Sequence, residues 1–328
     1  MYSIGLDISK ATIDIYIPIN NLNHKIDNNS KSVKSFYSKL KKLYKNDIEN
    51  IVFVFEPTGS YSNLLKKFCS ENSIKCFIVN PKKSINFAKA VGQRNKSDIQ
   101  DAVMLSKMIV TALEEEIKVP SINDVTEELH ELIAYYKFLL KQRTQNKNHL
   151  EAISVKNPTS IISKTIKQEI KSLSLKIDKI INEMKSILKK DKKLYEAFTN
   201  ISTIQGVGDI SAIVLLHHFI KYPNTNQKEI VSLAGLDPIS KSSGTSIQSK
   251  AKISKAGSKL CRSTLFMAVM VAVRFNDELK EYYEQLKNRG KHTTVCQIAV
   301  MRKIIIIAHS LYKNNEQYSA EKYNKFAA

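Results

Sequence analysis

Four acidic residues occupy positions from which they could bind divalent cations and act on phosphate esters. Asp7 and Glu56 each follow a short apolar run, which is typical of a residue at the end of a buried strand. Asp98 and Asp101 open an apolar-periodic stretch, so both would lie on one face of a helix. Hard cations take oxygen ligands and bind phosphate oxygens in turn. The four carboxylates therefore predict a site for a pair of metal ions.

A purely structural explanation exists for two of these acids. Asp98 and Asp101 would also stabilise a helix start, because negative charges interact favourably with the N-terminal end of the helix dipole. Two aspartates this close repel each other unless cations or protons intervene. The helix-start explanation leaves Glu56 unexplained, since that residue follows a run of apolar residues at 51–55.

The segments that carry the acids predict an α/β domain over residues 1–123. We expect strands at residues 2–7, 12–17, 24–28, 51–55 and 76–79, and helices at residues 33–44, 61–69 and 98–113. Three strands followed by helix, strand, helix, strand and helix is the order of the RNase H fold. The first and fourth strands are neighbours in that fold, so Asp7 and Glu56 would lie side by side.

Residues 124–200 predict a helical arm. Apolar residues recur at alternating spacings of four and three, at Ile166, Ile170, Leu173, Ile177, Ile180, Met184 and Ile187. This spacing is the seam of a coiled coil. An earlier helix carries Leu129, Leu132, Tyr136 and Leu139, and Pro158 separates the two. Heptads do not fix an oligomeric state, so an intramolecular helix pair and a dimerisation arm are both open.

Residues 201–328 predict a mostly helical domain with two features that could contact nucleic acid. Gly206 and Gly208 have the form of a helix-hairpin-helix turn, whose backbone N–H groups could bind a phosphate, although an ordinary helix start is the simpler explanation. Residues 237–259 predict a polar, flexible, basic loop that contains Ser243. A serine hydroxyl could attack a phosphodiester there. Loop serines are more often turn formers, and Ser242 is an adjacent rival.

The charge of the chain indicates a polyanionic partner. The 328 residues have a formal net charge of +20, and seven Lys and Arg but no acid lie between Asp237 and Asp277. Candidate nucleic-acid contacts are Lys10, Arg94, Lys96, Gly206, Gly208, Lys241, Lys250, Lys252, Lys255 and Arg262. A solvated loop is the alternative explanation for Arg94 and Lys96, and a coding bias that raises Lys along with Ile and Asn is the alternative explanation for the net charge.

The remaining composition favours a cytoplasmic protein of a bacterium or archaeon, associated with the nucleoid. The four cysteines form no C-x-x-C pair and are expected to be reduced thiols. No apolar run reaches the roughly 18 residues of a membrane span. The first residues form a strand-like segment with an acid in it, which is unlike a signal peptide.

Several of these segments resemble the DEDD transposases, which are RuvC-like recombinases of an insertion-sequence family related to the Piv/MooV DNA invertases. In the first domain the matching segments are residues 5–10 (GLDISK), 55–61 (FEPTGSY) and 95–102 (NKSDIQDA). In the last domain they are residues 205–208 (QGVG), 233–238 (LAGLDP), 243–244 (SG) and 253–262 (ISKAGSKLCR). The resemblance covers nearly the whole chain.

The resemblance implies a RuvC-like nuclease domain, a coiled-coil arm and a helical transposase domain. It implies two Mg²⁺ ions, with Mn²⁺ as an alternative, at Asp7, Glu56, Asp98 and Asp101. It also implies a nucleophilic serine, and Ser243 fits because the family's serine precedes a glycine. The implied partners are donor DNA, target DNA and a structured guide RNA, and we expect a homo-oligomer, either a dimer or a tetramer.

Two other functions are compatible with the residues. A RuvC-like endonuclease that hydrolyses branched DNA would need the four acids and no serine. A non-catalytic nucleic-acid-binding scaffold would need neither, and its acids would be structural.

Overall fold

The structure is a computed structural model of the 328-residue chain, and it describes residues 1–92, 97–156, 160–243 and 247–324. Side chains of residues 156, 241–250 and 323–324 lie outside the described part. The chain forms two compact units, Met1–Asn123 and Asp124–Ala328.

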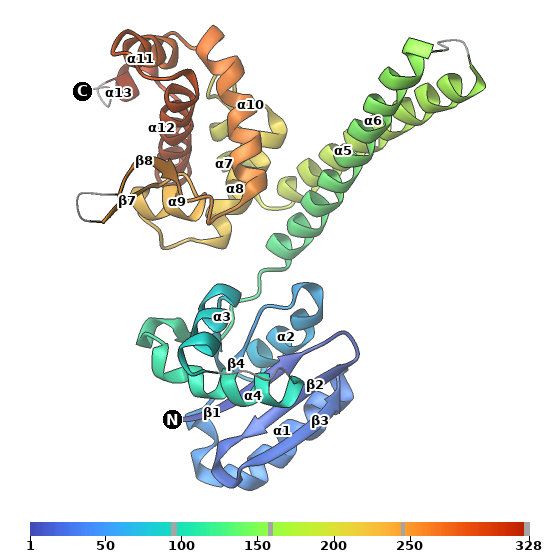
Figure 1. The fold of residues 1–328 in the computed structure, drawn as a ribbon, viewed down its shortest axis with the longest axis vertical. Helices are drawn as coiled ribbons and strands as arrows, with labels where there is room; N and C mark the ends of the chain where they lie inside the picture. The colour runs from blue at the N-terminus through green and yellow to red at the C-terminus, as the bar shows by residue number, and fades with distance from the viewer. Residues whose placement is uncertain (93–96, 157–159, 244–246, 325–328) are drawn as a thin grey trace. The chain divides into compact units, whose positions relative to one another are not determined.

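Unit 1 is built on one mixed sheet with the strand order β3-β2-β1-β4-β5-β6 (Figure 1). The strands are β1 (Tyr2–Ile8), β2 (Thr12–Ile17), β3 (Leu22–Asp27), β4 (Ile51–Phe55), β5 (Lys75–Ile78) and β6 (Ile117–Lys118). The first three strands pair antiparallel, and β1, β4 and β5 pair parallel. This confirms the predicted order of the first five strands and the predicted neighbourhood of the first and fourth.

The helices of unit 1 are α1 (Ser30–Tyr44), α2 (Asn63–Glu71), α3 (Pro81–Ala90) and α4 (Asp98–Lys107). The alternation of side chains along each strand divides the core between the two faces of the sheet. One face, with Ile4, Leu6 and Ile8 of β1, packs with α1 and α2. The other face, with Val52 and Val54 of β4, packs with α4.

Two predictions for unit 1 need correction. No helix was predicted between residues 80 and 97, yet α3 forms there and begins at Pro81 with Asn80 as its N-cap. Asn80 Oδ1 accepts the Lys82 N–H, and proline suits the first helical turn because its missing N–H would be unbonded there anyway. Helix α4 was expected to reach residue 113 but ends at Lys107, followed by a 3-10 turn at Met108–Thr111.

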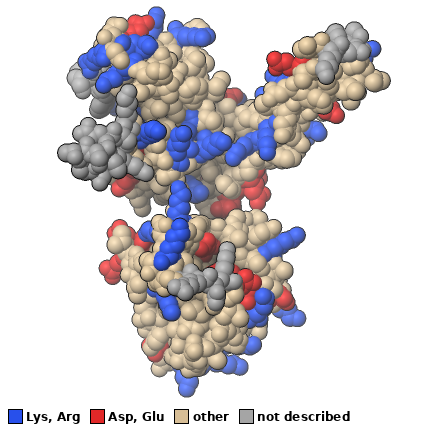
Figure 2. All heavy atoms as spheres, viewed as in Figure 1, with Lys and Arg blue, Asp and Glu red and all other residues tan. Residues whose placement is uncertain are grey.

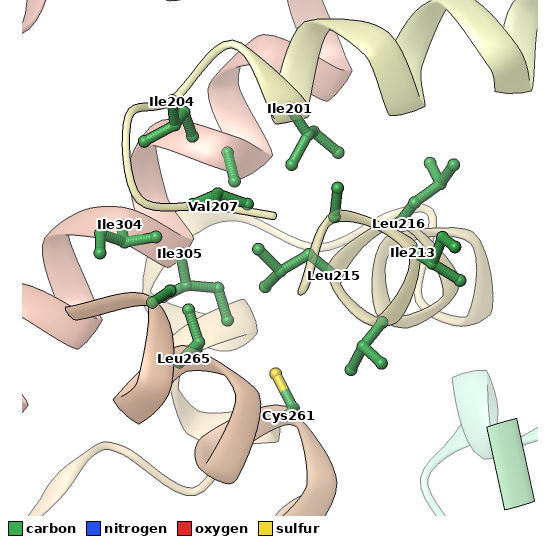
Figure 3. Packing of buried hydrophobic residues seen from close by; sticks show 14 of the residues in the cluster. Ile201, Ile204, Val207, Ile213, Leu215, Leu216, Cys261, Leu265, Ile304 and Ile305 are labelled. Carbon is green, nitrogen blue, oxygen red and sulfur yellow. The ribbon is translucent and has the colours of Figure 1, made fainter. Parts of the chain in front are cut away.

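Unit 2 is mostly helical. Its helices are α5 (Asp124–Lys156), α6 (Ile161–Lys189), α7 (Lys192–Ser202), α8 (Asp209–Lys221), α9 (Gln227–Leu233), α10 (Lys259–Phe275), α11 (Asp277–Asn288), α12 (Thr293–Asn314) and α13 (Ala320–Asn324). One hydrophobic core, with buried residues from Leu129 to Leu311, is formed by helices α5 to α12. Figure 3 shows its centre, where Leu215 of α8, Leu265 of α10 and Ile305 of α12 lie close together.

Helices α5 and α6 pack against each other as a long hairpin (Figure 1). The heptad residues of α6 are buried or half-buried along this contact. Pro158 lies outside the described residues. Buried residues of both hairpin helices also belong to the core that contains α8 and α12. The structure therefore accounts for the heptads by an intramolecular pair, and a role of the arm in oligomerisation stays a prediction.

The predicted loop at residues 237–259 was wrong in part. Strands β7 (Pro238–Ser243) and β8 (Ile247–Ile253) form an antiparallel hairpin with an irregularity between Ile239 and Lys241. The segment reads as a loop because its strands are polar and carry no apolar alternation. The hairpin is identified by the backbone pairing of β7 with β8.

Helix α12 is long and apolar enough to cross a membrane by composition. More than half of its apolar window (56%) is buried within unit 2, as in the core helix of a globular domain. The four cysteines are free and buried, as expected for reduced thiols.

Candidate active site

Helix α4 crosses β1 in a register that direct contacts define. Ser106 Oγ donates a hydrogen bond to Ser3 O at 2.8 Å. At Gly5 the helix backbone comes so close that an added Cβ would lie 1.9 Å from Ala102 O. Four helical residues advance about 6 Å and two strand residues about 6.6 Å, so this pairing continues by one step towards the helix start.

That further step brings the acids of α4 to the acid at the end of β1. Asp98 is four residues before Ala102, and Asp7 is two residues after Gly5. Asp101 is on the same first turn of α4, whose N-cap Ser97 accepts the Gln100 N–H. The chain therefore folds so that a helix start, rich in carboxylates, lies over the carboxyl end of β1.

Glu56 reaches the same place from the neighbouring strand. Leu6 of β1 pairs with Phe55 of β4 in parallel register, so Asp7 and Glu56 are the next residues of two adjacent strands. Val52 and Val54 face α4, and the alternation of the strand places Glu56 on that face. The expected convergence of Asp7, Glu56, Asp98 and Asp101 thus has a direct basis in register.

The electrostatics of Asp7 reflect this gathering of like charges. Burial of the carboxyl, followed by the charges of Asp101, Asp98, Glu56 and Asp14, raises the pKa of Asp7 from 3.8 to about 6. A cation bound at this position would offset the repulsion between Asp7 and the neighbouring carboxylates. The donor set consists of oxygens, which is what Mg²⁺ or Mn²⁺ prefers.

The four carboxylates are near one another but do not form a closed coordination shell. Among the residues that the structure describes, no three His, Cys, Asp or Glu side chains are close enough to hold a metal ion as they stand. Asp98 is exposed, so its side chain has room to turn towards a shared ion. The residues fit a divalent cation by charge and by chemistry.

Two neighbours of the acids were missed by the sequence analysis. Asp14 pairs directly with Asp7 across β1 and β2, is only 5% exposed, and forms an ion pair with Lys25 at 3.1 Å. Ser84 of α3 is buried and donates a short hydrogen bond to Glu56 Oε1. The apolar alternation of residues 13, 15 and 17 could have placed Asp14 on the other face of β2, but no sequence signal pointed to Ser84.

Basic residues lie near the acid cluster in sequence and, in one case, in structure. Lys10 is exposed in the tight turn between β1 and β2, which a Ser9 N–H to Thr12 O bond of 2.9 Å closes. It therefore stands at the same end of β1 as Asp7. Arg94 and Lys96 lie outside the described residues.

The candidate nucleophile belongs to unit 2. Ser243 is the last residue of β7, and its backbone pairs with Ile247. The side chains of Ser242, Ser243, Lys241 and Lys250 lie outside the described part. The predicted serine is therefore placed by its backbone, near the tip of the hairpin.

The other basic candidates of unit 2 differ in their surroundings. Lys252 and Lys255 are exposed, at and just after the end of β8. Arg262 is half-buried, and its Nη1 donates to Ala234 O at 3.0 Å and to Gly257 O at 2.9 Å. Arg262 thus ties two loops together, a role that its guanidinium would have to combine with any phosphate contact.

The two glycines of the predicted helix-hairpin-helix turn also differ. Gly206 has a positive φ of 98°, and a Cβ there would come within 2.8 Å of Ala272 on α10, so this glycine is required for packing. Gly208 is the N-cap of α8, is exposed and has no close neighbour. Asp209 in the first turn pairs with Lys185 at 2.8 Å. Gly208 is therefore the more accessible of the two predicted contacts.

Basic side chains are spread over the visible face of unit 2 and along its helical hairpin (Figure 2). With the net charge of +20, this surface is suited to a polyanion.

Family comparisons match both units of the chain. A DEDD transposase family model of the IS110 group matches residues 4–153, and a model described as "Transposase IS116/IS110/IS902 family" matches residues 199–284. Together the two matches span more than two-thirds of the chain. The chain belongs to this transposase family, whose members are enzymes that recombine DNA. Members of the family typically use a divalent metal.

Two relatives align with the chain over almost its full length. The pilin gene-inverting protein of Moraxella bovis is 26% identical over 324 residues, which are 96% of this chain and 97% of that protein. The pilin gene-inverting protein of Moraxella lacunata is 25% identical over 323 residues, with the same coverage of both chains. The chain is thus similar to these two gene-inverting proteins over almost its full length.

Proposed function

We propose that this transposase cuts and rejoins DNA with two sets of residues, a RuvC-like acid cluster in unit 1 and a serine nucleophile in unit 2. The register of α4 on β1 is the observation that supports the proposal most. It gathers four carboxylates from three separate segments at one end of a sheet, and burial and repulsion together raise the pKa of Asp7 to about 6. Only a cation or a proton relieves such repulsion.

Asp7, Glu56, Asp98 and Asp101 would hold the metal, which we expect to be two Mg²⁺ ions or, alternatively, Mn²⁺. Bound there, divalent ions would offset the negative charge that develops on phosphate oxygens during the reaction. The residues of the chain have their own tasks around this site. Ser84 fixes the direction of the Glu56 carboxylate through its hydrogen bond. Asp14, held by Lys25, keeps the field around Asp7 negative.

Ser243 is the proposed nucleophile, with Ser242 as its rival. Its hydroxyl oxygen would form a bond to a DNA phosphorus as one P–O bond of the DNA breaks, so the number of phosphoester bonds is unchanged. The hydroxyl proton would pass to the DNA oxygen that leaves the phosphorus. A hydroxyl of another DNA strand would then attack the phosphoserine, which forms a new DNA phosphodiester and releases the serine. Cutting and rejoining then need no external energy source.

A structured RNA is proposed as the guide that selects the donor and target DNA. The net charge of +20 leaves ample basic surface for RNA as well as DNA. Base pairing would read the sequence, while the protein would contact the backbone. The protein would work in the cytoplasm, at the nucleoid, as a homo-oligomer that holds two duplexes.

Substitution of the serines tests the chemistry. Ser243→Ala should abolish a covalent protein–DNA adduct on a denaturing gel, and Ser240→Ala, an exposed serine of the same strand, should leave the adduct intact. Loss of the adduct in Ser242→Ala alone would move the role to that residue. Continued DNA cutting by Ser243→Ala without any adduct in the wild type would instead identify a hydrolytic endonuclease.

Mixed variants test whether the two sets of residues act across subunits. Asp7→Ala and Ser243→Ala proteins should each be inactive alone. Activity restored by mixing them would show that the acids of one subunit work with the serine of another. No restoration would confine both sets to one subunit or require a different assembly.

A further inference from the structure

A pocket of about 250 Å³ opens in unit 2 between α9, α11 and α12. Helix α12 packs against both of the other two helices. Its polar lining includes Gln227, Tyr282, Arg302 and Lys303, and Ile306 contributes to its apolar wall. The volume is slightly below the roughly 300 Å³ at which pockets for drug-sized ligands begin. The pocket therefore suits one small ligand group. None of its residues has a part in the acid cluster or the serine hairpin.

Lys303 is the unusual member of this pocket. Its Nζ is buried and has no hydrogen-bond partner, and among the described residues it makes no ion pair. It lies 4.6 Å from the centre of the Tyr282 ring, which offers only a cation–π contact. A buried ammonium without an acceptor is destabilising, so this group would gain from an anion.

Burial lowers the pKa of Lys303, while the charges of Glu278 and Glu281 on α11 act in the opposite direction. Those two glutamates are close enough to influence the ammonium but do not pair with it. The side chain has a flexible four-carbon stem, so Lys303 can turn from the Tyr282 ring towards a ligand in the pocket.

Arg302 supplies a second, fixed cation to the same pocket. Its Nε donates a 2.7 Å hydrogen bond to Leu236 O, which orients the guanidinium plane. This bond uses one of five N–H donors, and the fork of a guanidinium matches the oxygens of a phosphate. The pocket thus combines one oriented cation with one that lacks an acceptor.

We propose that this pocket binds a phosphate group carried by a nucleotide, with Arg302 and Lys303 as its cationic contacts. The phosphate chemistry follows from the two cations, whereas nucleic acid as its source rests on the proposed function. An acidic peptide would offer carboxylates to the same cations. The net charge of +20 and the DNA-recombining family favour phosphate over it.

Calorimetric titration of the full chain, free of metal, tests the proposal. The probes are thymidine 5′-monophosphate, thymidine, a hexaglutamate peptide, and short single strands with and without a 5′-phosphate. Lys303→Met should weaken binding of the monophosphate by at least about tenfold, since a charge-assisted hydrogen bond is lost. Lys280→Met removes an exposed lysine of α11 and is the matched control, with binding unchanged.

Thermal unfolding without ligand shows whether Lys303→Met loses binding through loss of the cation or through loss of stability. Lys303→Met should melt no earlier than the wild type without ligand, because it removes a buried ammonium that has no acceptor. Earlier melting would identify Lys303 as a structural residue through its contact with Tyr282 and would overturn the proposal.

The probes also separate the sources of the phosphate and the alternatives. If strands bind only when they carry a 5′-phosphate, the ligand is a terminal phosphate. If strands with and without the 5′-phosphate bind equally, the ligand is an internal phosphate. The proposal is overturned if the wild type does not bind the monophosphate, if thymidine or hexaglutamate binds as tightly, or if Lys303→Met binds normally. The titration needs no catalysis, so a failure of the proposed serine chemistry would leave its result unaffected.

Discussion

Removing the charge of Asp7 should stabilise the metal-free protein while it abolishes recombination. Asp7 is half-buried among Asp101, Asp98, Glu56 and Asp14, and its pKa is raised from 3.8 to about 6. The ionised carboxylate is therefore less favourable in the folded state than in the unfolded state. Asp7→Asn keeps the shape of the side chain and removes the repulsion.

The sign and size of the effect follow from proton linkage. The folded protein holds the Asp7 proton more tightly, so the contribution of Asp7 to the stability of unit 1 is greatest below pH 3.8 and is lost as the pH rises to about 6. The whole shift corresponds to about 3 kcal/mol. Solvent screening of a half-exposed carboxylate reduces this to about 1–2 kcal/mol. Asp7→Asn should recover that amount at pH 8 and almost nothing near pH 3.8.

Hydrogen exchange with mass spectrometry measures this within the full chain, on peptides that contain β1 and β4. The chain has no tryptophan and two units, so a single global transition would not separate them. Glu49→Gln removes an exposed carboxylate before the start of β4, at the far end of that strand from Glu56, and should change protection by less than about 0.5 kcal/mol. Reduced or unchanged protection of Asp7→Asn at pH 8 would refute the repulsion that the structure implies.

Three further perturbations have definite outcomes. Gly5→Ala places a Cβ 1.9 Å from Ala102 O, so it should displace α4, lower the stability of unit 1 by about 3 kcal/mol or more and abolish recombination. Ser84→Ala removes the partner of Glu56 and should raise the Mg²⁺ concentration for half-maximal activity about tenfold, measured by metal titration of recombination. Burial lowers the pKa of His217 and of His218 from 6.5 to about 4. The free energy of unfolding of unit 2 should therefore fall by up to about 3 kcal/mol for each histidine as the pH falls from 6.5 to 4. Hydrogen exchange of α8 measures this loss.

Matched controls define what would contradict these expectations. Gly208→Ala meets no atom within 4 Å and should cost less than about 1 kcal/mol, so equal losses from both glycines would argue against the tight packing of α4. Ser38→Ala removes an exposed hydroxyl of α1 and should leave the metal requirement unchanged. The contributions of Asp7 and of the two histidines should respond to acid in opposite directions, so the gain from Asp7→Asn should shrink as the pH falls, and a gain that does not change with pH would contradict the stated cause.

The strands that carry the acids were predictable because their signals are local. The apolar run before Glu56 ends where β4 ends, and the alternation of Ile13, Ile15 and Ile17 marks β2. The order of these elements implied that β1 and β4 are neighbours, and the sheet confirms it. The neighbourhood of Asp7 and Glu56 could therefore be anticipated from sequence, and the binding of metal by all four acids stays a prediction.

Other parts depended on contacts that no local pattern encodes. The strand predicted at residues 76–79 is followed directly by Asn80 and Pro81, which begin α3 and so bring Ser84 to Glu56. The β7–β8 hairpin consists of polar residues, and only backbone pairing reveals it. The role of Gly206 depends on the approach of α10, which is more than fifty residues away in sequence.

Anomalous diffraction from crystals of the full chain grown with Mn²⁺ tests the central claim most directly. The account predicts manganese peaks at the carboxyl end of β1, within about 2.2 Å of oxygens from Asp7, Glu56 and at least one aspartate of α4. Asp7→Asn crystals should lose at least one peak. Carboxylates without manganese at saturating concentration, or manganese bound elsewhere in unit 1, would contradict the assignment of this cluster as the metal site.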